Sequence, residues 1–366
     1  MSARREVRRI LIVKAAALGD VLRTTSLLRP LARRHPGAWI AWLTSKAALP
    51  LLQTNPWLSA YAALGAAPLP GPGYDLVLSL EEDAGAARLA EESCRGEFVG
   101  VVSRGGRLSY TPSSAPYYDL SLLHRGVDGG HAEADRLKAA NRLTYAELWL
   151  KVLGLPVPRD RDALRPVLVL AEEDRGPARA FAAEHGLAGG PASPAGPIGL
   201  NPGAGGRWPA KQLSVESAAR LARALGRRFK RPILLFGGRD EAARNRRIAA
   251  ACRPGLRSGR GTAPVLDAGT GHSLRSFAGL VDLCAALVTT DTLALHVAAA
   301  LGKPTFVLVG PTSAAELDVF GRGEVLVPHG GCACFYRPRC LRGRSCLDRF
   351  PASKVCDAVG GYLETA

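Results

Sequence analysis

The chain has 366 residues, of which 47% are hydrophobic and 22% are charged. This length suggests two domains, since one domain usually holds about 100–200 residues. Lysine and arginine number 48 and aspartate and glutamate 32, which gives a formal net charge of +16 and favours an anionic partner. Only 6% of the residues are aromatic, and they are not interleaved with basic tracts, so we expect no nucleic-acid partner.

The first residues resemble the start of a signal peptide, because arginines precede the apolar run 10–13. Lys14 and Asp20 interrupt that apolar region, so residues 10–14 are predicted to be a buried strand instead. No apolar run reaches the roughly 18–20 residues that a membrane-spanning helix needs. Eight cysteines are too few for a disulfide scaffold and are typical of a reducing compartment. We therefore expect a soluble, cytoplasmic protein.

Short apolar runs alternate with helical patterns through the first half of the chain. The expected strands are 10–14, 39–43, 76–80 and 97–102, and the expected helices are 21–34, 84–94 and 142–153. Residues 103–135, rich in Arg, Tyr, Gly and Pro, are expected to be irregular.

A stretch of Gly, Pro and Ala at 186–197 has the composition of a linker, and the alternation resumes after it. The expected strands there are 198–200, 233–236, 286–290 and 305–309, and the expected helices are 213–229, 241–251, 274–284 and 293–301. This predicts the α/β class, with two doubly wound domains facing a central cleft. We assign 1–170 to the first domain, 171–197 to a helix and linker, 198–350 to the second domain, and 351–366 to a C-terminal helix.

The common nucleotide and hydrolase motifs are absent: there is no G-x-G-x-x-G after the first strand, no G-x-x-x-x-G-K-[ST] and no G-x-S-x-G. A glycine-rich segment nevertheless runs from Asn201 to Lys211, between a predicted strand and a predicted helix. Glycines such as Gly203 let backbone N–H groups approach an anion, and Lys211 adds a positive charge. The alternative is a flexible surface loop with a solvated lysine.

Two further segments place polar residues where a predicted strand ends and a helix begins. Asp291 and Thr292 precede a predicted helix, and His296 lies one turn later on the same face, which favours a diphosphate site. Asp20 follows the first strand, where a carboxylate can accept a proton from an attacking hydroxyl. The alternatives are helix N-caps for Asp20 and Asp291 and a structural role for His296.

Four motifs in this order resemble glycosyltransferase family 9, which includes the heptosyltransferases of lipopolysaccharide synthesis. They are 13–22, 199–204 with 208–211, 236–241, and 290–292 with 296–305 and 310–312. The resemblance extends from about residue 10 to about residue 350. It implies a GT-B fold and an inverting, metal-independent transfer from ADP-L-glycero-D-manno-heptose to a Kdo or heptose hydroxyl of the lipid A core.

The resemblance also implies roles for single residues. Asp20 matches the general base and Lys211 the lysine on the donor phosphates. Asp291, Thr292 and His296 match the diphosphate motif. The acidic ribose contact falls on Asp240 or Glu241, and no cofactor is required for catalysis. Leu293 departs from the family, which usually has glycine there, and this departure bears on the identity of the donor.

Cys332, Cys334, Cys340 and Cys346 form a C-x-C-x₅-C-x₅-C cluster. Four thiolates at this density predict a structural zinc site, and disulfides or free thiols are the alternatives. Asp160-Arg161-Asp162 resembles a metal-binding D-x-D but is better explained as a charged loop.

The acceptor implied by the family is a phosphorylated lipid, which predicts peripheral contact with the anionic inner face of the inner membrane. The expected contacts are the basic loop 103–135 and Arg4, Arg5, Arg8 and Arg9. Two other functions remain open: a family 9 transferase with a different nucleotide sugar for another surface glycan, and a catalytically silent nucleotide-binding relative.

Overall fold

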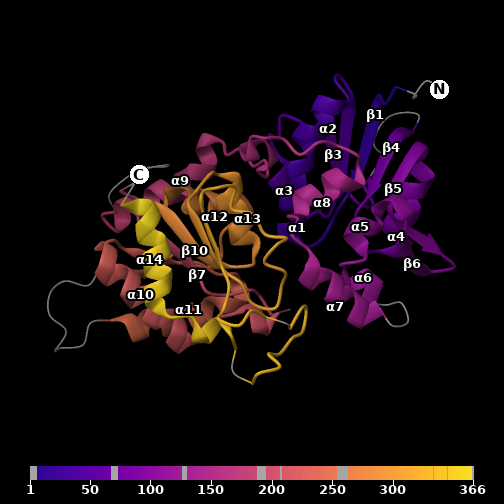
Figure 1. Cartoon of the computed structure of the whole chain (residues 1–366). Coiled ribbons are helices and arrows are strands. Elements are labelled where there is room, and N and C mark those ends of the chain that lie inside the picture. Colours follow the sequence, from indigo (N-terminus) through magenta and orange to yellow (C-terminus); the bar gives the residue numbers. More distant parts are fainter. Residues whose placement is uncertain are drawn as a thin grey trace. The chain divides into compact units, whose positions relative to one another are not determined.

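The computed structural model describes residues 6–66, 73–125, 130–187, 195–206, 208–253, 263–332, 334–343 and 345–364. It divides into two compact units, Met1–Val169 and Leu170–Ala366, and each unit is built on one six-stranded sheet (Figure 1).

The sheet of the first unit has the strand order β3-β2-β1-β4-β5-β6. Its strands are β1 (Arg9–Val13), β2 (Trp39–Thr44), β3 (Ala60–Ala63), β4 (Tyr74–Ser79), β5 (Cys94–Arg104) and β6 (Arg107–Tyr110). All neighbours are parallel except β5 and β6, which form an antiparallel pair. The central strand β1 is apolar at four consecutive buried positions, as expected for a strand covered on both faces.

The helices of the first unit are α1 (Leu18–Thr24), α2 (Leu28–Arg34), α3 (Leu49–Leu52), α4 (Ala84–Ser93), α5 (Ala115–Tyr118), α6 (Leu122–Arg125), α7 (Gly130–Ala140) and α8 (Tyr145–Val152). Short 3₁₀ turns are η1 (Thr25–Leu27), η2 (Pro112–Ser114) and η3 (Arg161–Leu164). The start of α8 is fixed by a capping box, in which Thr144 and Glu147 satisfy each other's backbone N–H groups.

The sheet of the second unit is parallel throughout and has the order β12-β11-β10-β7-β8-β9. Its strands are β7 (Ile198–Asn201), β8 (Ile233–Leu235), β9 (Val265–Asp267), β10 (Ala286–Thr290), β11 (Thr305–Leu308) and β12 (Gly323–Leu326). The helices are α9 (Glu172–Glu184), α10 (Val215–Phe229), α11 (Ala242–Cys252), α12 (Leu274–Leu283), α13 (Leu293–Ala300) and α14 (Ala352–Leu363). The 3₁₀ turns are η4 (Pro209–Lys211), η5 (Arg239–Glu241) and η6 (Leu347–Arg349).

The core of the second unit lies between its sheet and the helices α10 and α14, which pack side by side (Figure 1). Ser214 caps α10 by accepting a hydrogen bond from the Ser217 N–H. Leu221 and Leu225 of α10 and Val355 and Val359 of α14 are buried in this core, because both helices carry apolar residues at helical spacing on one face.

The predicted α/β class with two parallel-sheet domains is confirmed. Two local predictions were wrong. The helix expected over 21–34 is divided into α1, η1 and α2. Residues 103–125 and 130–135, expected to be irregular, contain β6, η2, α5, α6 and the start of α7. Residues 126–129 and part of the expected linker, 188–194, lie outside the described residues.

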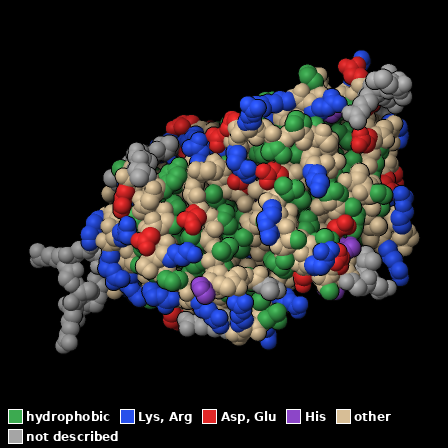
Figure 2. Space-filling view, in the orientation of Figure 1, with side chains coloured by type: hydrophobic (Ala, Val, Ile, Leu, Met, Phe, Trp, Pro, Cys, Tyr) green, Lys and Arg blue, Asp and Glu red, His purple; other side chains and the backbone are tan. Residues whose placement is uncertain are grey.

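Figure 2 shows Lys and Arg side chains scattered over the visible surface, with acidic and apolar side chains between them. Within the described residues, no helix is long and apolar enough to cross a membrane.

Candidate functional site

In each unit the strand order reverses at one point, and the predicted site residues follow the strands that meet there. The second sheet extends from β7 through β8 to β9 on one side and returns to β10 on the other. In the first sheet the corresponding neighbours are β1 and β4. In open α/β sheets, ligands bind outside the carboxyl ends of the strands at such a switch point. Asn201 is the last residue of β7, and Asp291 directly follows β10. Asp20 lies seven residues after the end of β1.

The loops after β7 and β10 are joined by side-chain hydrogen bonds. Asn201 Nδ2 donates to Thr292 Oγ1 at 2.9 Å and to Thr289 Oγ1 at 3.3 Å. The Thr290 hydroxyl donates to the Gly203 carbonyl at 2.8 Å. These contacts fix the first residues of the glycine-rich loop, Asn201 and Gly203, against the start of α13.

Lys211 and Asp291 form an ion pair across the same two loops. Lys211 Nζ lies 2.7 Å from Asp291 Oδ2, and the two side chains are only 11% and 13% exposed. The Lys211 ammonium also lies 5.8 Å from the centre of the Trp208 ring. Two residues 80 positions apart in sequence are thus paired at one edge of the sheet.

Glu241 is buried, and its carboxylate is hydrogen-bonded to the glycine-rich loop. Its carboxylate accepts hydrogen bonds from the N–H of Gly238 at 2.8 Å and from the N–H of Gly205 at 3.2 Å. Arg244 Nη1 lies 3.8 Å from Glu241 Oε1, and Arg244 donates to the Pro202 carbonyl at 3.1 Å and to the Leu213 carbonyl. Asp240, by contrast, is exposed. Of the two acidic candidates, Glu241 is engaged by the loop and Asp240 faces solvent.

The amino end of α13 carries three of the predicted residues. Thr292 is the N-cap, but its side chain makes no capping hydrogen bond, because the Thr292 hydroxyl is directed to Asn201 and Thr289. The first-turn N–H groups and the positive end of the helix dipole lie at this end of α13. His296 lies one turn along and is buried, and Leu293 at the first helical position is partly buried.

In the first unit, Glu81 holds the turn between β1 and α1. It accepts hydrogen bonds from the N–H groups of Ala15 and Ala16 at 2.7 and 2.8 Å, and Lys14 Nζ lies 3.4 Å away. Sequence reasoning missed Glu81; its position just after β4, the neighbour of β1, was the signal that could have identified it. Asp20 lies in the first turn of α1, and its side chain is 36% exposed.

Asp20 is paired within its own helix. Arg23 Nη2 lies 2.9 Å from Asp20 Oδ1, and the Arg23 guanidinium carbon lies 4.1 Å from the centre of the Tyr145 ring. The N-cap position of α1 is Ala17 and Asp20 lies inside the first turn, so Asp20 is not the N-cap residue that was its alternative.

The predicted membrane contacts are largely engaged with other groups. Arg8 pairs with Glu6 at 2.7 Å, and the Arg9 guanidinium carbon lies 4.2 Å from the centre of the Trp39 ring. Arg104 lies 3.7 Å from Glu91. Arg4 and Arg5 lie outside the described residues.

Within the segment 103–135, three polar side chains form a hydrogen-bonded group. The Tyr110 hydroxyl donates to Asp119 at 2.7 Å and lies 2.9 Å from His124 Nδ1. Burial raises the pKa of Tyr110 well above its ordinary value, and the hydrogen bond to Asp119 adds to this shift. Tyr110 is therefore neutral at physiological pH.

All eight cysteines are free thiols. The Cys332 thiol donates to the Cys346 sulfur, which lowers the pKa of Cys346 and raises that of Cys332. Cys334 Sγ accepts from the Leu341 N–H at 3.3 Å. Within the described residues, no three His, Cys, Asp or Glu side chains are grouped as metal ligands. Asp160 caps η3 by accepting from the Asp162 N–H, as expected for a charged loop.

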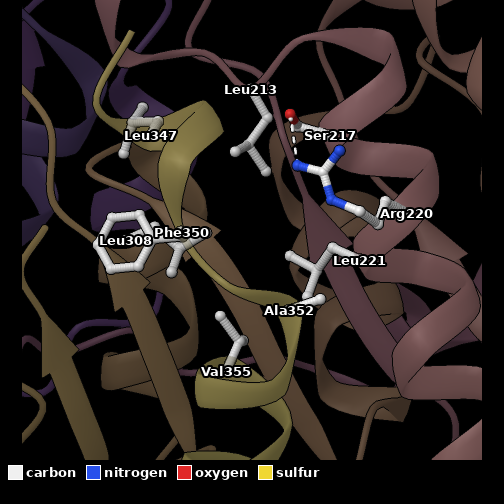
Figure 3. Close-up of a pocket in the computed structure, with 9 residues that line it drawn as sticks. All are labelled: Leu213, Ser217, Arg220, Leu221, Leu308, Leu347, Phe350, Ala352 and Val355. Atoms are coloured by element: carbon white, nitrogen blue, oxygen red, sulfur yellow. Dashed lines mark hydrogen bonds between the residues drawn. The ribbon is translucent and has the colours of Figure 1, made fainter.

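A small apolar pocket in the second unit lies between α10 and the segment that leads into α14 (Figure 3). Leu213, Leu308 and Phe350 line it, and Arg220 at its rim donates to the Ser217 hydroxyl at 3.0 Å. None of its lining residues is a predicted site residue, so we do not assign the site to it.

A sequence model of glycosyltransferase family 9 (heptosyltransferase) matches residues 144–328. Among curated proteins no match was found.

Solved structures are similar over nearly the whole chain, at 17–20% identity. A family 9 glycosyl transferase from Veillonella parvula has a TM-score of 0.67 at 17% identity and covers 98% of both chains. The ADP-heptose lipopolysaccharide heptosyltransferase II of E. coli has a TM-score of 0.60 at 20% identity, over 98% of this chain and 99% of that one. The E. coli heptosyltransferase WaaC with ADP-2-deoxy-2-fluoro heptose has a TM-score of 0.53 at 19% identity, again over 98% and 99%. These likenesses show the GT-B fold.

Proposed function

Because this chain belongs to glycosyltransferase family 9 (the heptosyltransferases), we propose that it transfers heptose from ADP-L-glycero-D-manno-heptose to the Kdo or heptose inner core of lipopolysaccharide, with inversion. One observation carries this proposal. The glycine-rich loop, the Lys211–Asp291 pair and the amino end of α13 lie together at the switch point of the second sheet. Backbone N–H groups, a cation and a helix start are the groups that stabilise a diphosphate.

In the proposed reaction, the acceptor oxygen attacks the anomeric carbon and the bond from that carbon to the diphosphate breaks. The proton of the acceptor hydroxyl passes to Asp20, which acts as the general base. Negative charge develops on the leaving ADP, where Lys211, the loop N–H groups and the dipole of α13 stabilise it. A diphosphate leaving group stabilised in this way needs no metal ion, and the mechanism uses none.

We assign the donor contacts as follows. Asn201 and Gly203 shape the loop beside the diphosphate, and Thr292 and His296 contact it from α13. Asp240 is assigned as the ribose contact because the Glu241 carboxylate is already bonded to two backbone N–H groups.

The donor nucleotide is tested by titrating the purified protein with ADP, UDP and GDP in a calorimeter. We expect ADP to bind most tightly and Asp240→Asn to weaken ADP binding at least tenfold, since one hydrogen bond to a charged group is worth about 1.5–3 kcal/mol. Tighter binding of UDP or GDP would contradict the ADP assignment. No binding of any nucleotide would reject the proposal altogether.

The second candidate is a family 9 transferase with another nucleotide sugar. Leu293 favours it, because this side chain occupies the first position of α13, where the backbone would approach a phosphate closely. If this candidate holds, Leu293→Gly should strengthen ADP binding, whereas an unchanged affinity would remove the reason for it.

We further propose that the acceptor is the lipid A core at the cytoplasmic face of the inner membrane, with the +16 charge drawing the protein to that anionic surface. Cosedimentation with vesicles of anionic and of zwitterionic lipid tests this. We expect binding to the anionic vesicles only, weakened by salt. Equal binding to both would contradict an electrostatic attraction.

A further inference from the structure

Asp20 and Arg23 belong to a closed ring of contacts that includes Tyr145. Arg23 bonds Asp20 Oδ1 at 2.9 Å and lies over the Tyr145 ring at 4.1 Å. The Tyr145 hydroxyl lies 2.6 Å from Thr24 Oγ1, and Thr24 Oγ1 donates to the Asp20 carbonyl, also at 2.6 Å. Because the Thr24 hydroxyl has one hydrogen and gives it to Asp20, Tyr145 must be the donor to Thr24. The ring thus fixes both the backbone and the carboxylate of Asp20.

The ring is held by the core of the first unit. Tyr145 is 6% exposed, and its ring packs edge-on against Tyr117 at 5.5 Å, with Trp149 also in contact. Tyr145 comes from α8, 121 positions after Thr24, so the contact depends on tertiary packing. The Arg23 side chain is only 18% exposed, which makes this pair drier than an ordinary surface i,i+3 pair.

Several elements pack against α1 around Asp20. Neither η1 nor α3, two of these elements, carries a titratable residue. From α8, burial raises the pKa of Tyr145 to about 12. Burial also raises the pKa of Tyr118 well above its ordinary value, and the negative charges of Glu82 and Glu81 add to this shift. Both tyrosines are neutral at physiological pH, and Arg23 is a cation at contact distance from Asp20.

We infer that Arg23 is a positioning residue for Asp20: seated on Tyr145, it orients the carboxylate toward the acceptor hydroxyl and keeps that carboxylate ionised. The inference rests on the proposed function, in which Asp20 is the base. The physical reason is that a neighbouring cation favours the charged form of a carboxylate. A carboxylate held at one oxygen also loses rotational freedom, and misplacement of a catalytic group by about 1 Å costs about 10²-fold in rate.

The test is the pH profile of kcat/KM for Arg23→Gln, Arg23→Lys and Tyr145→Phe. Removing the cation in Arg23→Gln should move the acidic limb about 1 pH unit toward higher pH, because the base then takes up a proton more readily. The plateau kcat should fall about tenfold or more while ADP affinity stays unchanged. Arg23→Lys keeps the charge and should keep the acidic limb. Tyr145→Phe keeps the ring under Arg23 and should lower kcat without moving the limb.

Arg136→Gln is the matched control, since Arg136 also forms an i,i+3 pair, with Glu133 at 2.7 Å, but on an exposed helix surface. We expect it to have the wild-type profile. An acidic limb in Arg23→Gln that coincides with that of the wild type would overturn the inference. If Arg23→Gln does not fold, Arg23→Lys provides the test. An acidic limb of Arg23→Lys that lies about 1 pH unit from that of the wild type would overturn the inference. Full activity of Asp20→Asn is a different result, which would reject the proposed function itself.

Discussion

The carboxylate of Glu241 occupies the space into which any side chain at Gly203 would project. A Cβ atom at Gly203 would lie 1.6 Å from Glu241 Oε1. Glycine at this position therefore permits close contact between the loop after β7 and the turn after β8. Glu241 in turn joins Gly205 and Gly238 by accepting their N–H groups.

Gly203→Ala should displace Glu241 and break its two hydrogen bonds to the loops. We expect a loss of about 2 kcal/mol in stability and at least a tenfold loss in ADP affinity, since a buried charged acceptor loses its donors. Thermal unfolding and calorimetric titration measure the two effects. Gly206→Ala is the matched control, because a Cβ at Gly206 meets no atom within 4 Å. Equal effects of the two substitutions would contradict the role of Glu241.

Lys211 and Asp291 should act as one unit in donor binding. Lys211→Ala should lower kcat by about 10²–10³-fold, the cost of removing a donor to a developing charge. Asp291→Asn should cost less, because it removes the partner that holds Lys211 but leaves the cation. The double variant should be no worse than Lys211→Ala alone, since coupled residues are not additive. Additive losses in kcat/KM would show that the two residues act independently.

The Asp174–Arg275 pair joins α9 to α12, and its contribution to stability should depend on pH. Arg275 Nε donates to Asp174 Oδ1 at 2.8 Å, and this bond lowers the pKa of Asp174 below its ordinary 3.8. A carboxyl whose pKa is lower in the folded state stabilises the protein above pH 3.8, and the stabilisation is lost as the pH falls through the lower folded pKa.

Asp174→Asn should therefore reduce the free energy of unfolding by about 3 kcal/mol at pH 7, the cost of leaving one charge of a buried pair alone. The difference from wild type should narrow as urea denaturation is repeated below pH 4. Glu172→Gln serves as the control, because Glu172 pairs with Arg179 on the exposed side of the same helix. A difference that stays constant with pH would mean that the ion pair is not its source.

Zinc binding by Cys332, Cys334, Cys340 and Cys346 stays a prediction, and elemental analysis of the reduced protein tests it. If the four thiolates hold zinc, the protein contains one equivalent of the metal, and Cys346→Ser loses it together with stability. Cys94→Ser, outside the cluster, should keep the metal. If the purified protein contains no metal and incubation with zinc does not raise its thermal stability, the zinc site is excluded.

The sequence was sufficient for the fold class because buried strands contain continuous apolar runs, as in β1 and β8. It was insufficient for β3, whose residues Ala60–Ala63 include three alanines with little β-propensity, and for the three-residue strand β9. Both are edge strands whose pairing depends on neighbours already in place. The same dependence explains why the helix predicted over 21–34 is interrupted at η1, where Thr25 bonds Val167 from far along the chain.

For the candidate site, the order of the motifs identified the residues in the loops after β7 and β10 but not the contacts between them. The pairing of Lys211 with Asp291 and of Arg23 with Tyr145 joins residues 80 and 122 positions apart, which local pattern does not reveal. The adjacent acids Asp240 and Glu241 could be told apart only by burial. Glu81 was missed because its hydrogen bonds to the N–H groups of Ala15 and Ala16 leave no mark in the sequence, and only its position just after β4 could have pointed to it.

The central claim is that Asp20 is the base of a transfer whose donor is held by the second unit. Its most direct test measures heptose transfer and ADP affinity for Asp20→Asn in the same preparation. We expect transfer to fall at least 10²-fold while ADP affinity stays at the wild-type value. Transfer at the wild-type rate would contradict the account.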